Sequence, residues 1–312
     1  MKLIKKLLLF TVVIVSFYSP ISAEIKIIYK INNEIITNHD IEKEYKFLIF
    51  FNKNLEKLNK KDLLKIATKS IIKEKIKKIE IEKSYKIKKE NFTFEDINNN
   101  FNLDSNINNE EDLGNYLKNF NLNLDEIKLK LEIERMWNQL VFDKFSYQIN
   151  IDENKLRNKL KKNQQLQKKF ITAYLLSEIL FSIERKEMLN DEFKKIKQSI
   201  NDIGFKNSSI TYGLSEASRK GGLIGWVDES QLSEEIINNL KTLKVNEFTN
   251  PISVPGGFLI LQINDKKEKK IDYDLEEELK RLIVFEKNRQ FNQFSTILFS
   301  KTKINSNIIL VE

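Results

Sequence analysis

SRKGGLIGW, residues Ser218–Trp226, is the stretch that decides how this chain folds. Six of the eight glycines and two of the three prolines in the 312-residue sequence lie between Gly213 and Gly257. The same window contains NPI at Asn250–Ile252 and GGF at Gly256–Phe258, whereas the chain around it is rich in lysine and isoleucine. Glycine is concentrated where the backbone needs a positive φ or a close approach. The pattern therefore predicts one compact, turn-rich unit inside a largely helical chain.

The composition excludes several kinds of chemistry. The sequence has no cysteine and one histidine, His39, which excludes thiol nucleophiles, the usual zinc sites and disulfide bonds. His39 follows Thr37 and Asn38 in a helix-start pattern, which favours a place beside the helix cap over a catalytic role. No glycine-rich phosphate motif is present, so we expect no cofactor, no metal and no ATP site. The net charge of +8 is spread over faces that mix lysine and glutamate, which argues against a nucleic-acid partner.

The N-terminus has the pattern of a secretory signal peptide. Three lysines precede the apolar run Leu7–Phe17, which is too short to span a bilayer comfortably, and Ala23 suits cleavage before Glu24. We therefore predict a signal peptide over residues 1–23, with a retained N-terminal anchor as the alternative. No later segment is apolar enough to cross a membrane, so we expect no transmembrane anchor after cleavage.

Hydrophobic periodicity and capping residues predict the order of the other elements. We expect a strand hairpin over 24–36, a helix capped at Thr37 or Asn38 that runs to about residue 49, and a long helix over 61–86. Further helices are expected after Thr93, near 110–120 and 124–145, and from 151 into the 161–169 region, with a loop over 98–109. The chain is predicted to end in a helix over 275–299 and a strand over 307–311.

The central window resembles the parvulin-type (PpiC) prolyl isomerase family. In that family a Gly-Gly-x-Leu-Gly-Trp turn is followed by a helix, a Pro-Ile strand and a Gly-aromatic hairpin strand, and Ser218–Phe258 contains matching pieces in this order. The pattern YKINNEIIT at Tyr29–Thr37, with Asp40 and a long helix after it, resembles the SurA-like periplasmic chaperones. That family also ends in a helix and a strand that return to complete its N-terminal domain.

Together these resemblances imply an α+β fold with a mainly helical, discontinuous chaperone domain. Residues 24–168 would form its N-terminal part, and residues 268–312 would supply the C-terminal helix and strand that complete it. Residues 169–267 would be the inserted parvulin-like α+β domain.

The parvulin resemblance also implies a site. The family holds a substrate proline in an apolar pocket with two facing histidines, a cysteine or aspartate, a methionine and a phenylalanine. The positions that match the two histidines are Glu178 and Leu259, and Leu214 matches the cysteine or aspartate. Leu232 and Ile236 match the methionine and the phenylalanine. All three polar positions are changed while both apolar ones stay apolar, so efficient isomerisation is not expected.

Four residues are candidates for binding substrate, and each has a plain structural alternative. Leu232 and Ile236 lie four apart on one helix face, so they fit a simple core as well as a pocket. Trp226 and Phe258 complete the candidate set. The burial habits of tryptophan favour core packing of Trp226 over stacking on a ligand.

The function that follows is a periplasmic folding chaperone of the holdase type. It would bind unfolded polypeptide clients, outer-membrane or secreted proteins, in a groove between the helical domain and the degenerate parvulin-like domain, without ATP. The alternative is an active peptidyl-prolyl cis-trans isomerase that uses Glu178 and the apolar pocket. A structural envelope protein without clients is a third possibility.

Overall fold

The fold is described from a computed structural model that covers residues 24–88, 92–101, 103, 106–165, 170–183, 185–270 and 274–311. The predicted signal peptide, residues 1–23, lies outside the described residues. The helices are α2 (Asn38–Phe51), α3 (Lys60–Glu82), α4 (Phe94–Phe101), α5 (Glu110–Lys118), α6 (Leu124–Phe145), α7 (Glu153–Gln165), α8 (Leu189–Tyr212), α9 (Glu234–Lys241) and α10 (Leu275–Ile304). The strands are β1 (Ile27–Ile31), β2 (Glu34–Thr37), β3 (Phe170–Phe181), β4 (Leu223–Asp228), β5 (Ile252–Val254), β6 (Gly257–Lys270) and β7 (Ile308–Leu310).

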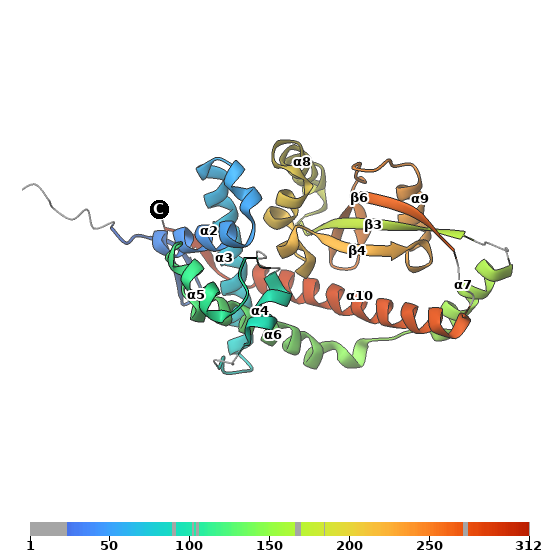
Figure 1. Cartoon of the computed structure of the whole chain (residues 1–312), viewed down its shortest axis with the longest axis horizontal. Coiled ribbons are helices and arrows are strands. Elements are labelled where there is room, and N and C mark those ends of the chain that lie inside the picture. The colour runs from blue at the N-terminus through green and yellow to red at the C-terminus, as the bar shows by residue number, and fades with distance from the viewer. Residues whose placement is uncertain are drawn as a thin grey trace, which may run out of the picture.

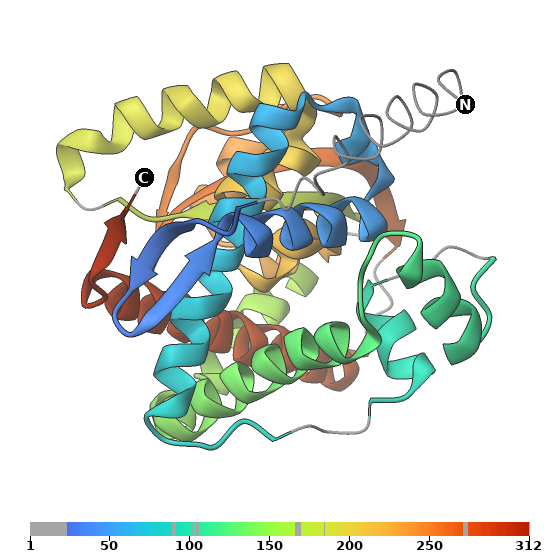
Figure 2. The same ribbon diagram turned by 90° about the vertical axis from the view of Figure 1, so that its left-hand side faces the viewer.

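The two ends of the described chain meet in a small sheet. Strands β1 and β2 form the predicted hairpin, and β7 pairs antiparallel with the other side of β1, so that Lys30 lies opposite both Ile35 and Ile309. Figure 2 shows the C-terminal strand beside the hairpin. This pairing joins the first and last described segments, and it supports the proposal that residues 268–312 complete an N-terminal domain.

The helix after the hairpin begins at the predicted cap. The Thr37 hydroxyl accepts a hydrogen bond from the Asp40 backbone N–H at 3.1 Å, and the Asp40 carboxylate accepts one from the Thr37 N–H at 2.8 Å. This reciprocal arrangement is a capping box, and it satisfies two backbone donors that the first helical turn leaves without partners. Helices α2, α3 and α6 then pack with α10 and the small sheet, and we call this part the helical unit.

The core of the helical unit depends on α10. Trp137 on α6 is 1% exposed, and its indole Nε1 donates a hydrogen bond to the Ser295 hydroxyl oxygen on α10 at 2.8 Å. The Trp137 ring also meets the Phe299 ring edge-on at 6.4 Å between centroids. A second apolar cluster joins α2 to α4, α5 and α6 around the buried side chains of Ile97, Leu113 and Ile127.

The glycine-rich window lies in a second, four-stranded sheet. All its pairings are antiparallel and the strand order is β4-β3-β6-β5. Helix α8, which is kinked at Gly204, packs on one face, and α9 packs on the other. We call residues 170–270 the sheet unit. In Figure 1 it lies above α10, with α8 between the sheet and the helical unit.

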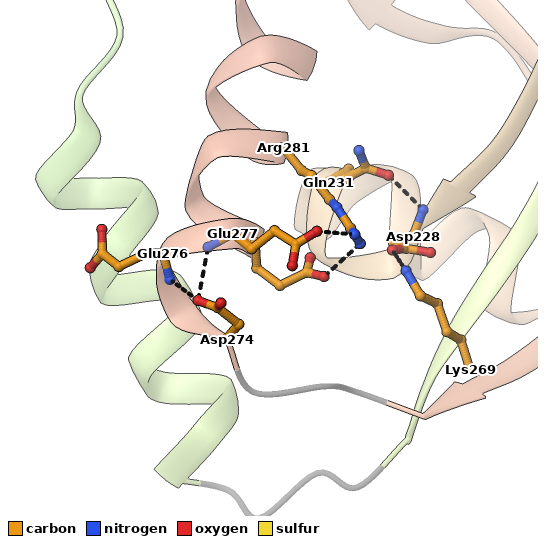
Figure 3. Close-up of polar contacts among 8 residues, drawn as sticks. Asp228, Gln231, Lys269, Asp274, Glu276, Glu277 and Arg281 are labelled. Atoms are coloured by element: carbon orange, nitrogen blue, oxygen red, sulfur yellow. Dashed lines mark hydrogen bonds and ion pairs between the residues drawn. The ribbon is translucent and has the colours of Figure 1, made fainter.

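Helix α10 connects the two units. Its first turn is capped by Asp274, whose carboxylate accepts hydrogen bonds from the Glu276 and Glu277 N–H groups at 3.1 Å each. One turn later Arg281 pairs with Glu277 at 2.6 Å and with Glu278 at 3.0 Å. Figure 3 shows this charged turn beside the end of β4, where Asp228 accepts from Lys269 at 2.6 Å. The same helix therefore contacts the sheet unit near its start and the helical core near its end.

The predicted elements are confirmed except in three places. Residues 98–101 are helical and belong to α4, not to the predicted loop, because Phe101 packs on Phe47 and Phe51 of α2. Helix α3 ends at Glu82, not at the predicted residue 86. Helix α10 runs to Ile304, not to residue 299. Among the described residues, no helix is both long enough and apolar enough to cross a membrane.

Candidate functional site

One face of the four-stranded sheet brings most of the predicted pocket residues together. Glu178 lies opposite Leu261 in the β3–β6 pairing, and Leu180 lies opposite Leu259. Because alternate residues of a strand point to the same face, Glu178 and Leu259 share the face that Leu261 presents to α9. Leu232, which is 6% exposed, belongs to the apolar cluster on this face, and Ile236 and Leu259 pack against it. Four of the predicted residues thus lie on one face.

The other predicted residues lie elsewhere. Phe258 precedes Leu259 in β6 and therefore points to the opposite face, where it packs on Phe181 at 5.9 Å between ring centroids. Leu214 packs against the core of the helical unit, although its backbone N–H donates to the Leu180 carbonyl oxygen at 2.7 Å. No local sequence pattern predicts this contact, because the core of the helical unit is built from residues far from Leu214 along the chain.

Trp226 does not pack in a core, so that expectation is wrong. Its side chain is 42% exposed because its neighbour Val227 takes the position that faces the apolar cluster. The Lys267 ammonium group lies 4.0 Å from the centre of the indole, a cation–π contact. Its role in substrate binding remains a prediction.

An aromatic side chain from α10 packs on the pocket. Phe285 contacts the cluster that contains Leu232, with Ile236 and Leu259 also packed against that cluster. Helix α7 adds a polar contact, because the Lys159 ammonium group donates to the Leu232 carbonyl oxygen at 2.8 Å. Burial lowers the pKa of Lys159. The predicted pocket residues are therefore in contact with the chain's own α7 and α10, which no local sequence pattern predicted.

The surroundings of Glu178 disfavour the ionised form of its carboxyl group. Burial raises the pKa of its carboxyl above the ordinary value for glutamate, while the nearby Ser215 side chain acts in the opposite direction. The positions matched to the family's other polar residues, Leu259 and Leu214, carry no group that could exchange a proton. The predicted pocket residues that the structure brings together thus present apolar side chains and one carboxyl whose protonated form is favoured by burial.

The glycine turn fixes the position of Glu178 in the sheet. The Glu178 backbone N–H donates to the Gly222 carbonyl oxygen at 2.8 Å, and the Ser209 hydroxyl donates to the Glu178 carbonyl oxygen at 2.7 Å. Gly222 has a φ of +81°, and a Cβ atom there would lie 2.2 Å from the Glu178 carbonyl oxygen. Only glycine fits this turn, for steric reasons and not for catalysis.

A cavity lies between the two units. It has a volume of about 670 Å³ and is lined by α2, α3, α4, α6, α8, α10 and the segment Gly213–Lys220. We call it the central cleft. Phe51, Ile72 and Phe101 of the helical unit contribute apolar surface, and Ile210 and Leu214 of the sheet unit face the same space. No group of three potential metal ligands occurs among the residues that the structure describes.

Comparison with known families identifies the sheet unit. Residues 151–278 match the family model described as the PPIC-type PPIASE domain. This chain contains a PpiC-type parvulin domain. The sheet unit forms most of that match, and the Ser218–Trp226 turn lies within it.

Curated relatives of the matched region are chaperones. The chain is 27% identical over 152 residues to the Chaperone SurA of Pseudomonas putida, which covers 46% of this chain and 34% of that protein. It is 30% identical over 101 residues to the Chaperone SurA of Salmonella typhimurium, which covers 30% of this chain and 24% of that protein. The chain thus matches about a third or less of the length of these relatives.

The solved structures matched by the chain include bacterial chaperones and isomerases, all at low identity and low TM-score. A chain from work on the SurA-like chaperones PEB4 and Cj1289 of Campylobacter jejuni is 16% identical, with a TM-score of 0.36 over 92% of this chain and 99% of that one. The peptidylprolyl isomerase PrsA of Bacillus anthracis is 18% identical, with a TM-score of 0.30 over 75% of this chain and 95% of that one.

Proposed function

We propose that this protein is a periplasmic folding chaperone, a holdase that binds unfolded outer-membrane or secreted polypeptides in the central cleft. The observation that carries the proposal is the cleft itself, whose apolar lining comes from both the helical unit and the parvulin domain. A space of about 670 Å³ takes several side chains of an extended segment. Relatives named Chaperone SurA match part of the chain and support the same assignment.

The substitutions in the parvulin pocket support holding over catalysis. Isomerisation requires an X–Pro bond to be twisted over a barrier of about 20 kcal/mol. Glu178, Leu214 and Leu259 occupy the positions that the family resemblance assigns to polar residues, and Phe285 packs on the apolar remainder. Client binding is therefore proposed in the central cleft, with release governed by weak affinity and by folding of the client.

Location in the periplasm is proposed from the N-terminal signal pattern and the chaperone relatives. The discontinuous domain of residues 24–168 and 268–312, with residues 169–267 inserted, is proposed together with it. The pairing of β7 with β1 supports this division.

The test is suppression of aggregation. The protein without residues 1–23 is mixed with a chemically unfolded outer-membrane protein in the absence of ATP, and light scattering is followed on dilution. Wild type should suppress scattering near equimolar ratio. Ile72→Ser, which places a hydroxyl on the apolar lining of the cleft, should lose much of this effect, whereas Val284→Ser on the exposed side of α10 should keep it. Full suppression by Ile72→Ser that is folded by circular dichroism would reject the cleft as the client site.

An isomerase is the second candidate, because the family model that matches residues 151–278 describes a PPIase domain. A protease-coupled assay of proline isomerisation in a short peptide separates the two functions. Acceleration by wild type that is lost in Glu178→Ala would establish the enzyme. The holdase proposal expects no acceleration above the uncatalysed rate.

A further inference from the structure

The walls of the central cleft carry both glutamates and lysines. Most of the glutamates are paired with a lysine, whereas four of the lysines form no ion pair among the described residues. The lining includes glutamates on α2, α3 and α6. Glu44 and Glu74 both bind the buried ammonium group of Lys130, the first at 2.6 Å. Glu134 binds Lys77 at 2.5 Å. Two lysines thus pair with these three carboxylates, which leaves the group with one negative charge.

Four exposed lysines also line the cleft. Lys69, Lys206, Lys220 and Lys303 line the cleft from α3, α8, the turn before β4, and α10. None of the four forms an ion pair with any carboxylate in the part of the chain that the structure describes. Lys69 lies over the Tyr212 ring, 3.9 Å from its centre, and Lys220 donates to the Asn99 carbonyl oxygen at 3.3 Å. Four segments of the chain thus each contribute a lysine to the lining of the central cleft.

Two further carboxylates, those of Glu192 and Glu216, line the cleft. Glu192 pairs with Lys195 at 3.1 Å, and Glu216 is exposed at the edge of the cleft. Burial lowers the pKa of Lys69, and Lys303, Lys195 and Lys65 lower it further, while Glu192 acts in the opposite direction. The four lysines outnumber the exposed Glu216 and the one negative charge left on the Lys130 group, so a carboxylate brought to the cleft would meet a favourable potential.

We infer that the central cleft selects extended polypeptide segments in which acidic side chains alternate with bulky apolar ones. The apolar residues would lie against the lining around Phe51 and Ile72, and the carboxylates would reach the lysines at the opening. This inference rests on the proposed holdase function and specifies which clients that function would favour. Purely apolar segments would bind through the lining alone, and segments rich in lysine would be repelled.

The experiment uses three fluorescein-labelled twelve-residue peptides with the same phenylalanines and leucines, separated by glutamate, glutamine or lysine. Fluorescence anisotropy with the protein without residues 1–23 should give the tightest binding for the glutamate peptide. At low salt it should bind at least tenfold more tightly than the lysine peptide. This ratio should fall as sodium chloride is raised toward 0.5 M, since salt screens exposed charges.

Charge variants assign the preference to the cleft. Lys69→Gln combined with Lys303→Gln should weaken the glutamate peptide several-fold and leave the glutamine peptide unchanged. The matched control, Lys280→Gln combined with Lys287→Gln, removes the same charge from exposed positions nearer the start of α10 and should change neither.

Two different failures can be told apart. Equal binding of the three peptides, or an equal loss in the control variant, would overturn the acidic preference and leave the holdase function standing. Absence of binding to every peptide, together with failure to suppress aggregation of unfolded protein, would overturn the holdase function and this inference with it.

Discussion

Lys159 on α7 donates a hydrogen bond to the backbone carbonyl oxygen of Leu232 at 2.8 Å, and so connects the helix before the sheet unit to the predicted pocket. Phe285 of α10 packs on the cluster that contains the Leu232 side chain. Nearby, Arg157 of α7 pairs with Glu276 of α10. The pocket that a family member would offer to a substrate is here in contact with two helices of the same chain.

Removing the aromatic ring on α10 should uncover this pocket. Phe285→Ala is expected to increase the fluorescence of the apolar dye ANS and the affinity for a proline-containing peptide. It should create no isomerase activity, because the polar groups at the matched positions are still missing. The cost in stability should be below the about 3–5 kcal/mol of a fully buried phenylalanine, since Phe285 is only partly buried.

The adjacent residue provides the control for Phe285. Val284 is 58% exposed, so Val284→Ala should leave dye binding and peptide affinity at wild-type values. Equal dye binding by Phe285→Ala and wild type would show that Phe285 does not cover the pocket.

The ionisation of Glu178 should oppose folding at neutral pH. Burial raises the pKa of this carboxyl in the folded protein, so the folded state favours the protonated form. The destabilisation is therefore absent below the ordinary glutamate pKa, grows as the pH rises from there to the folded-state pKa, and is fully present above it. Glu178→Gln should raise the midpoint temperature of unfolding at pH 7 and change it little at pH 4. A variant that is less stable than wild type at pH 7 would contradict this sign.

The stability of the protein should depend on Lys130, the cation of the buried ion-pair group in the cleft wall. Lys130 is buried between Glu44, which is 3% exposed, and Glu74, and these two carboxylates raise the pKa of Lys130 despite its burial. Lys130→Met leaves both carboxylates without their shared partner and should lower the free energy of unfolding by about 3–5 kcal/mol. Urea denaturation at pH 7 measures the change.

An exposed pair on the same helix is the comparison for Lys130. Lys128 binds Glu110 at 2.9 Å, and the Glu110 side chain is 49% exposed. Lys128→Met should therefore cost no more than about 1 kcal/mol. Similar costs for the two variants would mean that burial is not what makes the Lys130 group important.

The glycine turn should not accept a side chain. In Gly222→Ala the new Cβ atom would lie 2.2 Å from the Glu178 carbonyl oxygen, at a φ of +81° that alanine rarely adopts. We expect a loss of at least about 2 kcal/mol, from strain in the backbone and from displacement of β4. Thermal unfolding of the purified variant checks this.

Another glycine gives the opposite expectation. Gly114 lies within α5, and a Cβ atom there would meet no atom within 4 Å. Gly114→Ala should therefore stabilise the protein by up to about 1 kcal/mol through helix propensity. Destabilisation by both variants to the same degree would argue against a specific steric role for Gly222.

Local chemistry predicted most of the elements, and the resemblance to the parvulin family predicted the domain in the centre of the chain. The cap at Thr37 and the turn at Gly221–Gly222 depend on residues a few positions apart, so their geometry can be read from the sequence. The order of elements after Ser218, expected from the parvulin resemblance, is the order that the structure shows. The helical state of residues 98–101 was missed, because the packing of Phe101 on Phe51 overrides the weak helix preference of the asparagines before it.

The sequence by itself determined most helices, strands and turns, because caps, glycine turns and hydrophobic periods act over short distances, and its resemblance to the parvulin family indicated the α+β fold. The tertiary structure alone decided which side chains meet. It separated Phe258 and Trp226 from Leu232, placed Phe285 on the pocket, and brought Lys69 and Lys303 to one cleft from positions 234 residues apart. Such contacts depend on how distant segments pack, and the two faces of a strand differ by a single residue, so no local pattern specifies them.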